Sequence, residues 1–580
     1  MLRKKDNNMN GSDIVVESLV ENGVTHIFGV PGDTSMNFHD ALSRNGKIQY
    51  IVCRDERNAA YMADGYARVL NRHGVVDVPS GGGVLYCIPG LAESNDSSIP
   101  LVCISSDITM SSEETEALTD VRQLELTAPV TKWNCKIKST KKIQQYIQKA
   151  FRIALLGKPG ATHVSIPENI HGEEIVWAYK KTARPPSLFS LKSGPGNYDC
   201  LAVKEAILKA KYPIIIAGGG VHSSGAYDPL LEFSEKLGAF VATSINGKGS
   251  ISEVHPLSIG VIGANGGSEE TNKIVSSADL VIILGSKMNN VTSMGGAIFN
   301  EEQTIIQVDI SEKILGTNVY THLPILGDIV QFLRNMNNIL RDEQQNISSR
   351  HQWKSMVGEI LQRKKNRIKI EEKNNTKFVN PAKFFKTLMS LVDENTIFIA
   401  DAGTPTPYIA SYCRMRLSGR HTVMPRAHGS LGYALPAAIG VKVAKPDTTV
   451  VSMFGDGSFG MALGDLETAK RVGLPIIFVN FQNNSYGWIK TIQKLYYDER
   501  YYAVDFDKID ATRISEGFGL KAKKISSNDE IESVLHWSLQ QKSPVLLDVY
   551  IETPTELIPP VVKWERDKTV PVEKRKKLTY

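Results

Sequence analysis

The sequence has little cysteine and no strong excess of either charge. Six cysteines occur in 580 residues, and no two stand in a CxxC pair, so neither a disulfide framework nor a thiolate metal site is indicated. Lys plus Arg outnumber Asp plus Glu by only five, 67 against 62, and this gives nucleic-acid binding no support from composition. No apolar run approaches the length of a membrane span, and the first residues carry charge without the apolar stretch of a secretory signal. These absences argue against nucleic-acid or membrane partners and favour a soluble, cytoplasmic protein with reduced, buried cysteines.

What is present is the composition of a globular chain, 42% hydrophobic and 22% charged. Apolar strand-like runs alternate with helical patterns along three successive segments, an alternation that predicts parallel sheets covered by helices. The predicted fold class is therefore α/β, with three doubly wound, mostly parallel-sheet domains, the second of them Rossmann-like. Their expected bounds are residues 12–180, 198–338 and 380–557, followed by a basic tail at 558–580 that we expect to be solvated.

The ends and connections of these domains follow from local signals. The first helix is expected to be capped by Ser12 or Asp13. A segment rich in Pro, Ser and Gly at residues 184–197 is expected to link the first two domains. Residues 338–377 are expected to form a polar helical connector, and their run of basic side chains is typical of a solvated helix face.

The most informative pattern is a strand, a helix and a second strand in the last third of the chain. Residues 450–454 form a buried-strand pattern, residues 462–472 an amphipathic helix that stops at a glycine, and residues 475–479 the start of the next strand. Such a crossover is right-handed in about 98% of cases and lays its strands parallel. Asp456 and Asn483, which follow the two strands, are therefore expected at the same carboxyl edge of the sheet, where open α/β sheets bind ligands.

Oxygen donors at that edge point to a hard cation and a phosphate group. Carboxylate, amide and backbone carbonyl oxygens suit Mg²⁺ or Ca²⁺ and not Zn²⁺. Gly457 and Ser458 open the helix with backbone N–H groups that suit phosphate oxygens. A single Gly-Asp-Gly is more often a plain turn, and the asparagine after the following strand makes a binding site the better interpretation.

A second motif lies in the first segment. Residues 54–68 follow directly on a strand and indicate a helix with Glu56 in its first turn, where an acidic side chain ordinarily compensates the helix dipole. Together with Phe-Gly-Val-Pro-Gly at residues 28–32, Ala-x-Gly-Tyr-Ala-Arg at residues 63–68 and the later Gly-Asp-Gly and Asn-Asn, this arrangement resembles the thiamine-diphosphate enzymes. Within them the chain resembles the acetolactate synthase and benzoylformate decarboxylase group of 2-oxoacid enzymes, over nearly its whole length.

The resemblance implies a role for three residues at the pyrimidine end of the cofactor. Glu56 would bond to N1′ of the aminopyrimidine and favour the imino tautomer, whose 4′-nitrogen takes the proton from C2 of the thiazolium; Glu56 is the expected catalytic residue. A raised pKa of this carboxyl would help it share the proton. The carbonyl of Gly429 would accept a hydrogen bond from the 4′-amino group, and Leu431 would be the bulky side chain that bends the cofactor.

The resemblance also implies the ligands at the diphosphate end. Asp456, Asn483 and the Ser485 carbonyl would hold Mg²⁺. Gln482 stands where the family has the first of two asparagines, and this register puts the metal on Asn483 rather than Asn484. The implied cofactor-binding residues are, in full, Pro31, Gly32, Glu56, Gly403, Thr404, Gly429, Ser430, Leu431, Gly455, Asp456, Gly457, Ser458, Asn483, Ser485, Tyr486 and Gly487.

Several positions depart from the family's pattern near the expected substrate pocket. The family's Ser-Gly-Pro-Gly loop appears as Ser-Gly-Gly-Gly at residues 80–83, and the synthases' Phe-Gln-Glu appears as Leu-Thr-Asp at residues 118–120. Their large aromatic residue aligns with Ile492, while Trp488 lies four residues earlier. His428 is a nearby candidate for proton transfer, although packing is the simpler interpretation. These departures leave the product open.

We therefore predict a thiamine-diphosphate- and Mg²⁺-dependent lyase or carboligase that acts on a small 2-oxoacid, in a homodimer or homotetramer with active sites at the subunit interface. A 2-oxoacid decarboxylase and a diketone C–C hydrolase on the same cofactor stay open, because fold does not fix function. A non-catalytic cofactor-binding relative is less favoured, because Glu56 and the metal pair are both present. The glycines of residues 217–222 are a weak dinucleotide fingerprint without GxGxxG spacing, so FAD, and an oxidoreductase that would depend on it, is not favoured.

Overall fold

A computed structural model describes residues 8–177, 193–343 and 350–577 of the chain. The linker predicted at residues 184–197 lies largely outside the described residues. The chain divides into two compact units, which are described separately. The first holds residues 1–191, 425–447 and 462–474, and the second holds residues 192–424, 448–461 and 475–580.

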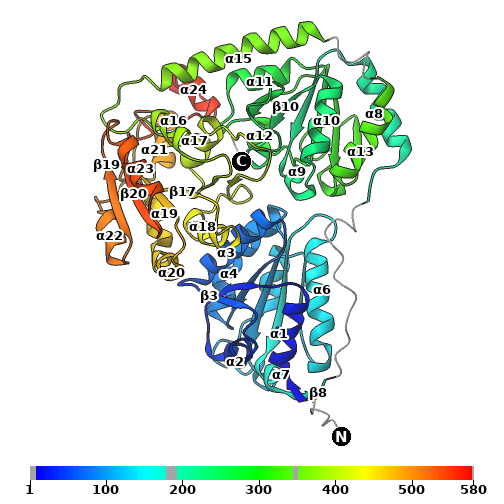
Figure 1. Cartoon of the computed structure of the whole chain (residues 1–580), viewed down its shortest axis with the longest axis vertical. Coiled ribbons are helices and arrows are strands. Elements are labelled where there is room, and N and C mark those ends of the chain that lie inside the picture. Colours follow the sequence, from blue (N-terminus) through cyan, green and yellow to red (C-terminus); the bar gives the residue numbers. More distant parts are fainter. Residues whose placement is uncertain (1–7, 178–192, 344–349, 578–580) are drawn as a thin grey trace. The chain divides into compact units, whose positions relative to one another are not determined.

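The first unit is built on a six-stranded parallel sheet of order β3-β2-β4-β5-β7-β6. Aliphatic side chains of α1 (Gly11–Glu21) and α6 (Ile143–Leu155) pack on one face of this sheet, and Figure 1 shows both helices on that side. The other face is covered by helices α3 (Glu56–Leu70) and α4 (Gly82–Asp96), and α18 (Ala434–Ala444) packs against α3. The strands are β2 (His26–Gly29), β3 (Gln49–Val52), β4 (Gly74–Val78), β5 (Leu101–Asp107), β6 (Trp133–Lys136) and β7 (Ala161–Pro167).

The second unit contains two further six-stranded parallel sheets. The first, of order β11-β10-β9-β12-β13-β14, consists of β9 (Pro213–Ala217), β10 (Phe240–Thr243), β11 (Ser258–Val261), β12 (Leu280–Leu284), β13 (Thr304–Asp309) and β14 (Leu323–Leu326). The second, of order β16-β15-β17-β18-β20-β19, consists of β15 (Ile397–Ala400), β16 (Thr422–Val423), β17 (Val450–Gly455), β18 (Ile477–Gln482), β19 (Lys521–Ile525) and β20 (Val545–Tyr550). Three parallel sheets with helices between their strands confirm the predicted fold class.

The remaining helices cover these sheets. In the first unit they are α2 (Met36–Asn45), α5 (Gln123–Thr127), α7 (Glu168–Gly172) and α20 (Leu466–Val472). In the second unit they are α8 (Asn197–Lys209), α9 (Gly219–Ser224), α10 (Tyr227–Leu237), α11 (Glu269–Ser276), α12 (Asn290–Ser293), α13 (Ile329–Ile339), α15 (His351–Glu371), α16 (Pro381–Leu391), α17 (Pro405–Tyr412), α19 (Asp456–Ala462), α21 (Gly487–Tyr496), α22 (Ala511–Gly517), α23 (Ile531–Leu539) and α24 (Val562–Asp567). Among the described helices none is long and apolar enough to cross a membrane.

Each sheet reverses its strand order at an interior position, and open α/β sheets bind ligands at the carboxyl edge there. In the first unit the reversal lies between β2 and β4. In the two sheets of the second unit it lies between β9 and β12 and between β15 and β17. The segments that follow these six strands are therefore where a cofactor site is expected.

Two local predictions were wrong in detail. The first helix is capped by Asn10, whose side chain accepts from the N–H of Asp13, and not by Ser12 or Asp13. The helix predicted at residues 462–472 begins earlier, as α19 at Asp456, and is interrupted by a 3-10 turn at Leu463–Asp465 before α20.

The basic run of the connector lies on a largely exposed helix, as predicted, although part of this helix packs on the second unit, and the basic tail is less solvated than predicted. Helix α15 lies along α11, as Figure 1 shows, and buries Trp353 in the core of the central sheet. Lys364 of its basic run donates to the Ile259 carbonyl at 3.1 Å, and Arg367 pairs with Glu270 at 3.1 Å. The tail begins with helix α24, whose Trp564 is buried. A run of like charges predicts solvation poorly where the opposite side of the same helix is apolar.

Candidate cofactor site

The loop after β18 folds around the carboxylate of Asp456. The backbone N–H groups of Asn483 and Ser485 donate to this carboxylate at 3.1 and 3.2 Å. Burial raises the pKa of Asp456 to about 6, although these backbone donors oppose the shift. Among the described residues no lysine or arginine forms an ion pair with it. A buried carboxylate without a cationic partner is suited to a metal ion, because the ion would favour the charged form.

The register of this loop is set by a row of buried amides that the sequence analysis missed. Asn480 Nδ2 donates to Asp548 Oδ1 at 2.9 Å and to Gln482 Oε1 at 2.8 Å, and Gln482 Nε2 donates to Asn484 Oδ1 at 3.0 Å. Asn484 takes a left-handed conformation with φ +56°. Its side chain is thereby directed to Gln482, which leaves Asn483 as the asparagine beside Asp456. Asp548 lies far along the chain, on β20, so no local spacing could have indicated it.

Oxygen atoms of the loop are close to one another. Ser485 Oγ donates to Asn483 Oδ1 at 2.7 Å, and the Ser485 carbonyl accepts from the N–H of Gly487 at 2.8 Å. The donor set of a carboxylate, an amide oxygen and a backbone carbonyl fits Mg²⁺. Among the described residues no group of three His, Cys, Asp or Glu side chains is arranged for a metal.

Two glycines open the same edge of the sheet. A Cβ on Gly457 would lie 2.3 Å from the ring of Tyr486, so this position must be glycine for the ring to pack on the start of α19. Gly403 has φ +95° and follows β15, the strand beside β17. Asp401 at the start of that segment is fully buried, and its carbonyl accepts from Thr406 at 2.6 Å. The predicted diphosphate residues thus flank the reversal between β15 and β17.

In the first unit, Glu56 is the first residue of α3, directly after β3. Asp55 caps the helix by accepting from the N–H of Arg57 at 2.8 Å. Asp465, a buried residue that the sequence analysis missed, accepts from the N–H of Arg54 at 3.0 Å and from Asn58 Nδ2 at 2.7 Å. These two carboxylates fix the backbone on either side of Glu56.

The carboxylate of Glu56 has the environment that its predicted role needs. Its side chain is partly buried, and this burial raises its pKa above the ordinary value. A Cβ on Gly83 would clash with Pro79 Cδ at 2.6 Å and would lie at contact distance, 3.5 Å, from Glu56 Oε1, so the Gly83 loop lies next to this carboxylate. Pro31 and Gly32 follow β2 and Gly83 follows β4, and these strands flank the reversal of this sheet.

The predicted pyrimidine turn also lies in the first unit. Gly429 and Gly432 have φ +68° and +79° and bend the chain before α18. Gly429 is exposed, and Ser430 and Leu431 are partly exposed. Leu431 is therefore not part of the buried core of this unit.

Helices α3 and α18 cross at very short range, as Figure 1 shows them side by side. A Cβ on Gly440 would lie 1.9 Å from the Met62 carbonyl oxygen, and a Cβ on Gly65 would lie 2.4 Å from the Ala437 carbonyl oxygen. The glycines of the two motifs therefore meet backbone to backbone. This contact explains why both motifs, far apart in sequence, contain a glycine at that point.

A row of hydroxyl groups stands beside the Ser80 loop. Ser80 Oγ lies 3.1 Å from Thr34 Oγ1 and 2.8 Å from Thr119 Oγ1. Thr119 has φ +68°, a strained conformation for a β-branched residue. Gly81 lies against it, because a Cβ there would be 2.7 Å from Thr119 Cβ. Strained residues of this kind concentrate at binding sites.

Helix α21, which starts at the end of the Asn483 loop, packs against the C-terminal segment. The rings of Trp488 and Trp564 lie 4.3 Å apart, and Tyr496 donates to Asp567 at 2.5 Å. Ile492 is buried with Val561 and Trp564 in the same small core. Of Ile492 and Trp488, only Trp488 remains partly exposed.

The corresponding edge of the central sheet is closed by backbone contact. A Cβ on Gly218 would lie 2.2 Å from the Gly285 carbonyl oxygen, and the N–H of Gly220 donates to that oxygen at 3.0 Å. These glycines follow β9 and β12, which flank the reversal of strand order. These glycines allow the two loops to pack backbone to backbone, and this packing explains why glycines occur here without the spacing of a dinucleotide site.

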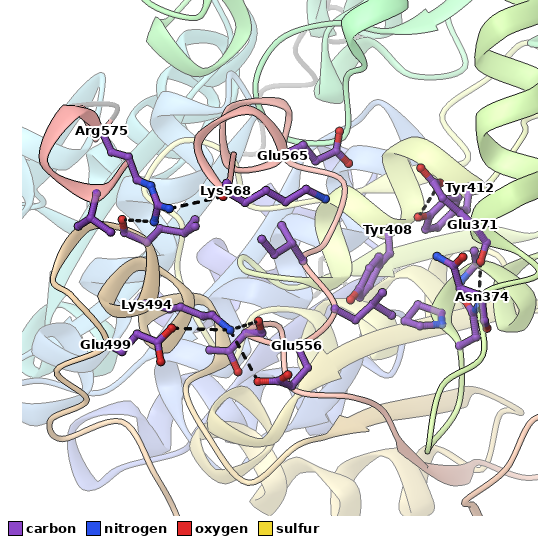
Figure 2. A pocket seen from close by; sticks show the side chains of 18 of the residues that line it. Glu371, Asn374, Tyr408, Tyr412, Lys494, Glu499, Glu556, Glu565, Lys568 and Arg575 are labelled. Atoms are coloured by element: carbon purple, nitrogen blue, oxygen red, sulfur yellow. Dashed lines mark hydrogen bonds and ion pairs between the residues drawn. The ribbon is translucent and has the colours of Figure 1, made fainter. Parts of the chain in front are cut away.

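A cavity of about 510 Å³ in the second unit is separate from the predicted site residues. Figure 2 shows that its polar groups pair with one another: Lys494 Nζ lies 3.8 Å from Glu556, and Tyr412 donates to Glu371 at 3.2 Å. None of the predicted cofactor-binding residues lines it.

The predicted residues thus form two sets, each within one unit. The first unit contains Pro31, Gly32, Glu56, Gly429, Ser430 and Leu431. The second unit contains Gly403, Thr404, Gly455, Asp456, Gly457, Ser458, Asn483, Ser485, Tyr486 and Gly487. Both sets lie after strands at the carboxyl edge of a parallel sheet. Sheets of this kind, with a carboxylate and oxygen donors at their reversals, define a cofactor-dependent α/β enzyme.

Comparisons with known proteins identify the class of enzyme. Residues 9–126 match the N-terminal TPP binding domain of thiamine pyrophosphate enzymes, residues 201–336 their central domain, and residues 401–549 their C-terminal TPP binding domain. The chain is 31% identical to the acetolactate synthase large subunit of Buchnera aphidicola subsp. Schizaphis graminum, over 95% of this chain and 96% of that protein. It is also 31% identical to a probable acetolactate synthase large subunit of Methanocaldococcus jannaschii (95% and 93% covered).

A third relative, the acetolactate synthase isozyme 3 large subunit of Escherichia coli, is 29% identical over 95% of this chain and 96% of its own length. The chain therefore belongs to the thiamine pyrophosphate enzymes, in their acetolactate synthase-like group. The resemblance stated from the motifs is confirmed, and the protein is a thiamine-diphosphate-dependent enzyme.

Proposed function

We propose that the enzyme binds thiamine diphosphate together with Mg²⁺ and catalyses carboligation of a small 2-oxoacid. The cofactor supplies, when bound, a carbanion at thiazolium C2 that adds to a carbonyl group. The observation that carries the proposal is that one chain contains both Glu56, with its raised pKa, and the Asp456 loop with its oxygen donors.

The protein's residues would bind, orient and move protons around this group. Asp456, Asn483 and the Ser485 carbonyl would hold the metal ion, and Gly457 and Ser458 would face the diphosphate. Glu56 would hold a proton at the pyrimidine N1′, for which a raised carboxyl pKa is suitable. Loss of CO₂ from the 2-oxoacid would be followed by capture of the remaining fragment by a second carbonyl compound.

Three relatives are named acetolactate synthases, and this supports carboligation over simple decarboxylation. The burial of Ile492 by the C-terminal segment and the exposure of Trp488 distinguish this chain's substrate side, so the second substrate is left to experiment. A screen of 2-oxoacids and diketones with thiamine diphosphate and Mg²⁺, following CO₂ and product together, would separate a carboligase from a decarboxylase and from a diketone hydrolase. CO₂ without a carboligation product would refute the proposal.

The proposed assembly is a homodimer, or a dimer of dimers, in which Glu56 of one subunit serves the metal loop of the other. Separately inactive Glu56→Gln and Asp456→Asn proteins would then recover activity when mixed, to about a quarter of the parent value after random exchange into dimers. No recovery, in a sample shown by native mass spectrometry to contain mixed dimers, would place both ends of each site in one subunit.

We propose that the enzyme works in the cytoplasm and without FAD. The six cysteines are free thiols, five of them buried, which suits a reducing compartment. The close packing of the glycines after β9 and β12 and their lack of GxGxxG spacing support the proposal that FAD is not used. A flavin band in the visible spectrum of the purified protein would contradict the second statement.

A further inference from the structure

A buried cluster of four ionisable side chains joins α3, α4 and the start of α18. Arg68 Nε donates to Asp64 Oδ1 at 2.6 Å, and Arg68 Nη2 donates to Glu93 Oε1 at 3.3 Å. The Tyr433 hydroxyl donates to Asp64. All four side chains are at most 3% exposed. Ion pairs at this depth are costly to bury and are strongly destabilising to break singly.

Glu93 extends this cluster to the pyrimidine turn. Its two carboxylate oxygens accept the backbone N–H groups of consecutive residues, Ala427 at 3.3 Å and His428 at 3.0 Å. Ser97 Oγ donates to the same carboxylate at 2.7 Å. The next residue in the chain is Gly429. A charged acceptor that holds two successive amides fixes the peptide plane between them, and therefore the direction from which the turn begins.

The Arg68 cation is retained in this cluster, and the His428 side chain lies outside it. Burial opposes the charge of Arg68, yet Asp64, Tyr433 and Glu93 together raise its pKa, so the cation is retained. The side chain of His428 points elsewhere, to a pair with Asp96 at 2.9 Å in which both partners are about half exposed. The anchoring of the turn thus depends on the backbone and on Glu93, and not on the His428 imidazole.

We propose that Glu93 is a positioning residue for the cofactor's aminopyrimidine, because it clamps the residues before Gly429 to α4 and, through Arg68, to the helix that begins with Glu56. This inference rests on the proposed function. Without the clamp, the turn would sample orientations in which the Gly429 carbonyl does not face the 4′-amino group.

Glu93→Gln is the sharpest test, because the side chain keeps its shape while one of the two carboxylate oxygens that accept backbone N–H groups is replaced by an NH₂ donor. We expect the affinity for thiamine diphosphate at saturating Mg²⁺, measured by calorimetry, to fall by about tenfold, the usual weight of a hydrogen bond to a charged group. Exchange of the bound cofactor's C2 proton for deuterium, read by NMR after an acid quench, should slow. The KM for the 2-oxoacid should stay near the parent value while kcat falls.

The matched control is Glu253→Gln in the second unit. Glu253 is also buried and ion-paired, with Lys248 at 2.7 Å, and it also accepts a backbone N–H, from Met415 at 2.8 Å. This variant should lower thermal stability without changing cofactor affinity or C2 exchange. If Glu93→Gln does not fold, Ser97→Ala, which removes one donor to the same carboxylate from a partly exposed position, should give a smaller loss of affinity in the same direction.

The outcomes are distinct. A parent protein that takes up no thiamine diphosphate refutes the proposed function itself. A parent that binds it, with a folded Glu93→Gln or Ser97→Ala protein of unchanged affinity and C2 exchange, overturns the positioning role. The same is true if Glu253→Gln reduces affinity as much as Glu93→Gln, because the loss would then reflect stability alone.

Discussion

The crossing of α3 and α18 can be tested by adding a single methyl group. In Gly440→Ala the new Cβ would start 1.9 Å from the Met62 carbonyl oxygen, where real Cβ contacts essentially never fall below 3.0 Å, so the two helices must separate by about 1.1 Å. The obstacle is backbone and cannot rotate away. Overpacking of this kind costs about 1–3 kcal/mol, and the upper end applies here. Alanine's better helix propensity returns up to about 1 kcal/mol.

The expected net loss is therefore about 2 kcal/mol of the first unit's free energy of unfolding. For a unit of this size each kcal/mol lowers Tm by about 2–4 °C, so differential scanning calorimetry should show a transition lowered by about 4–8 °C. Because α3 carries Glu56 and α18 follows the pyrimidine turn, affinity for thiamine diphosphate should fall as well.

The control for this variant is Gly358→Ala, the same change inside helix α15. A Cβ at Gly358 meets nothing within 4 Å, so propensity alone should act and stability should rise by about 0.5–1 kcal/mol. A Gly440→Ala protein with a Tm equal to or above that of the parent would refute the close crossing. A decrease of similar size in Gly358→Ala would show that the method reports something other than helix contact.

Three further predictions concern single residues at or near the predicted site. Asp456→Asn should abolish Mg²⁺-dependent binding of thiamine diphosphate, measured by calorimetry, and retained binding would exclude Asp456 as a ligand. The Tm of the cofactor-free variant at about pH 8 should equal or exceed that of the parent. The reason is that burial raises the pKa of this carboxyl to about 6, so its ionised form opposes folding above that pH. Burial also raises the pKa of Asp548 to about 6 from 3.8, so the stabilisation from this shift is present below about pH 4 and is lost as pH rises to about 6. Asp548→Asn should therefore stabilise the cofactor-free protein by up to about 3 kcal/mol above pH 7 and by about half of that near pH 5; chemical denaturation at both values measures this, and equal effects would be inconsistent with it. Thr119→Gly should relieve the strain of the positive φ and raise the free energy of unfolding by about 1 kcal/mol. The KM for the 2-oxoacid should rise while the affinity for the cofactor is unchanged. A parallel loss of cofactor binding would show that the row of hydroxyl groups does not face the substrate.

Much of the fold and of the site could be predicted because the signals are local. The strand predicted at residues 450–454 lies within β17, since buried parallel strands are continuous apolar runs. The parallel pairing of β17 with β18, which follows from one crossover, was also confirmed. The predicted positions of Glu56 and of Asp456 with Asn483 follow from strand ends, and their roles stay predictions.

What could not be predicted depends on contacts between distant segments. Glu93, Asp465 and Asp548 are ordinary acidic residues in the sequence, and only tertiary packing makes them buried acceptors of backbone or amide groups. The interruption of the helix between α19 and α20 is of the same kind, because Asp465 in the 3-10 turn binds Arg54 and Asn58 of the first domain. The basic residues of the C-terminal segment led to a prediction of solvation, although the same segment also carries apolar side chains, such as Trp564, that are buried.

The contact between the tilted rings of Trp488 and Trp564 gives the protein a built-in optical reporter. Only six tryptophans occur in the chain, and two of them touch at the junction between α21 and α24. Any event that lifts the C-terminal helix away would separate the two indoles and alter the emission of the protein. Release of that helix during turnover would therefore be visible in stopped-flow fluorescence without a label, and a tag fused directly after residue 567 would risk silencing the signal.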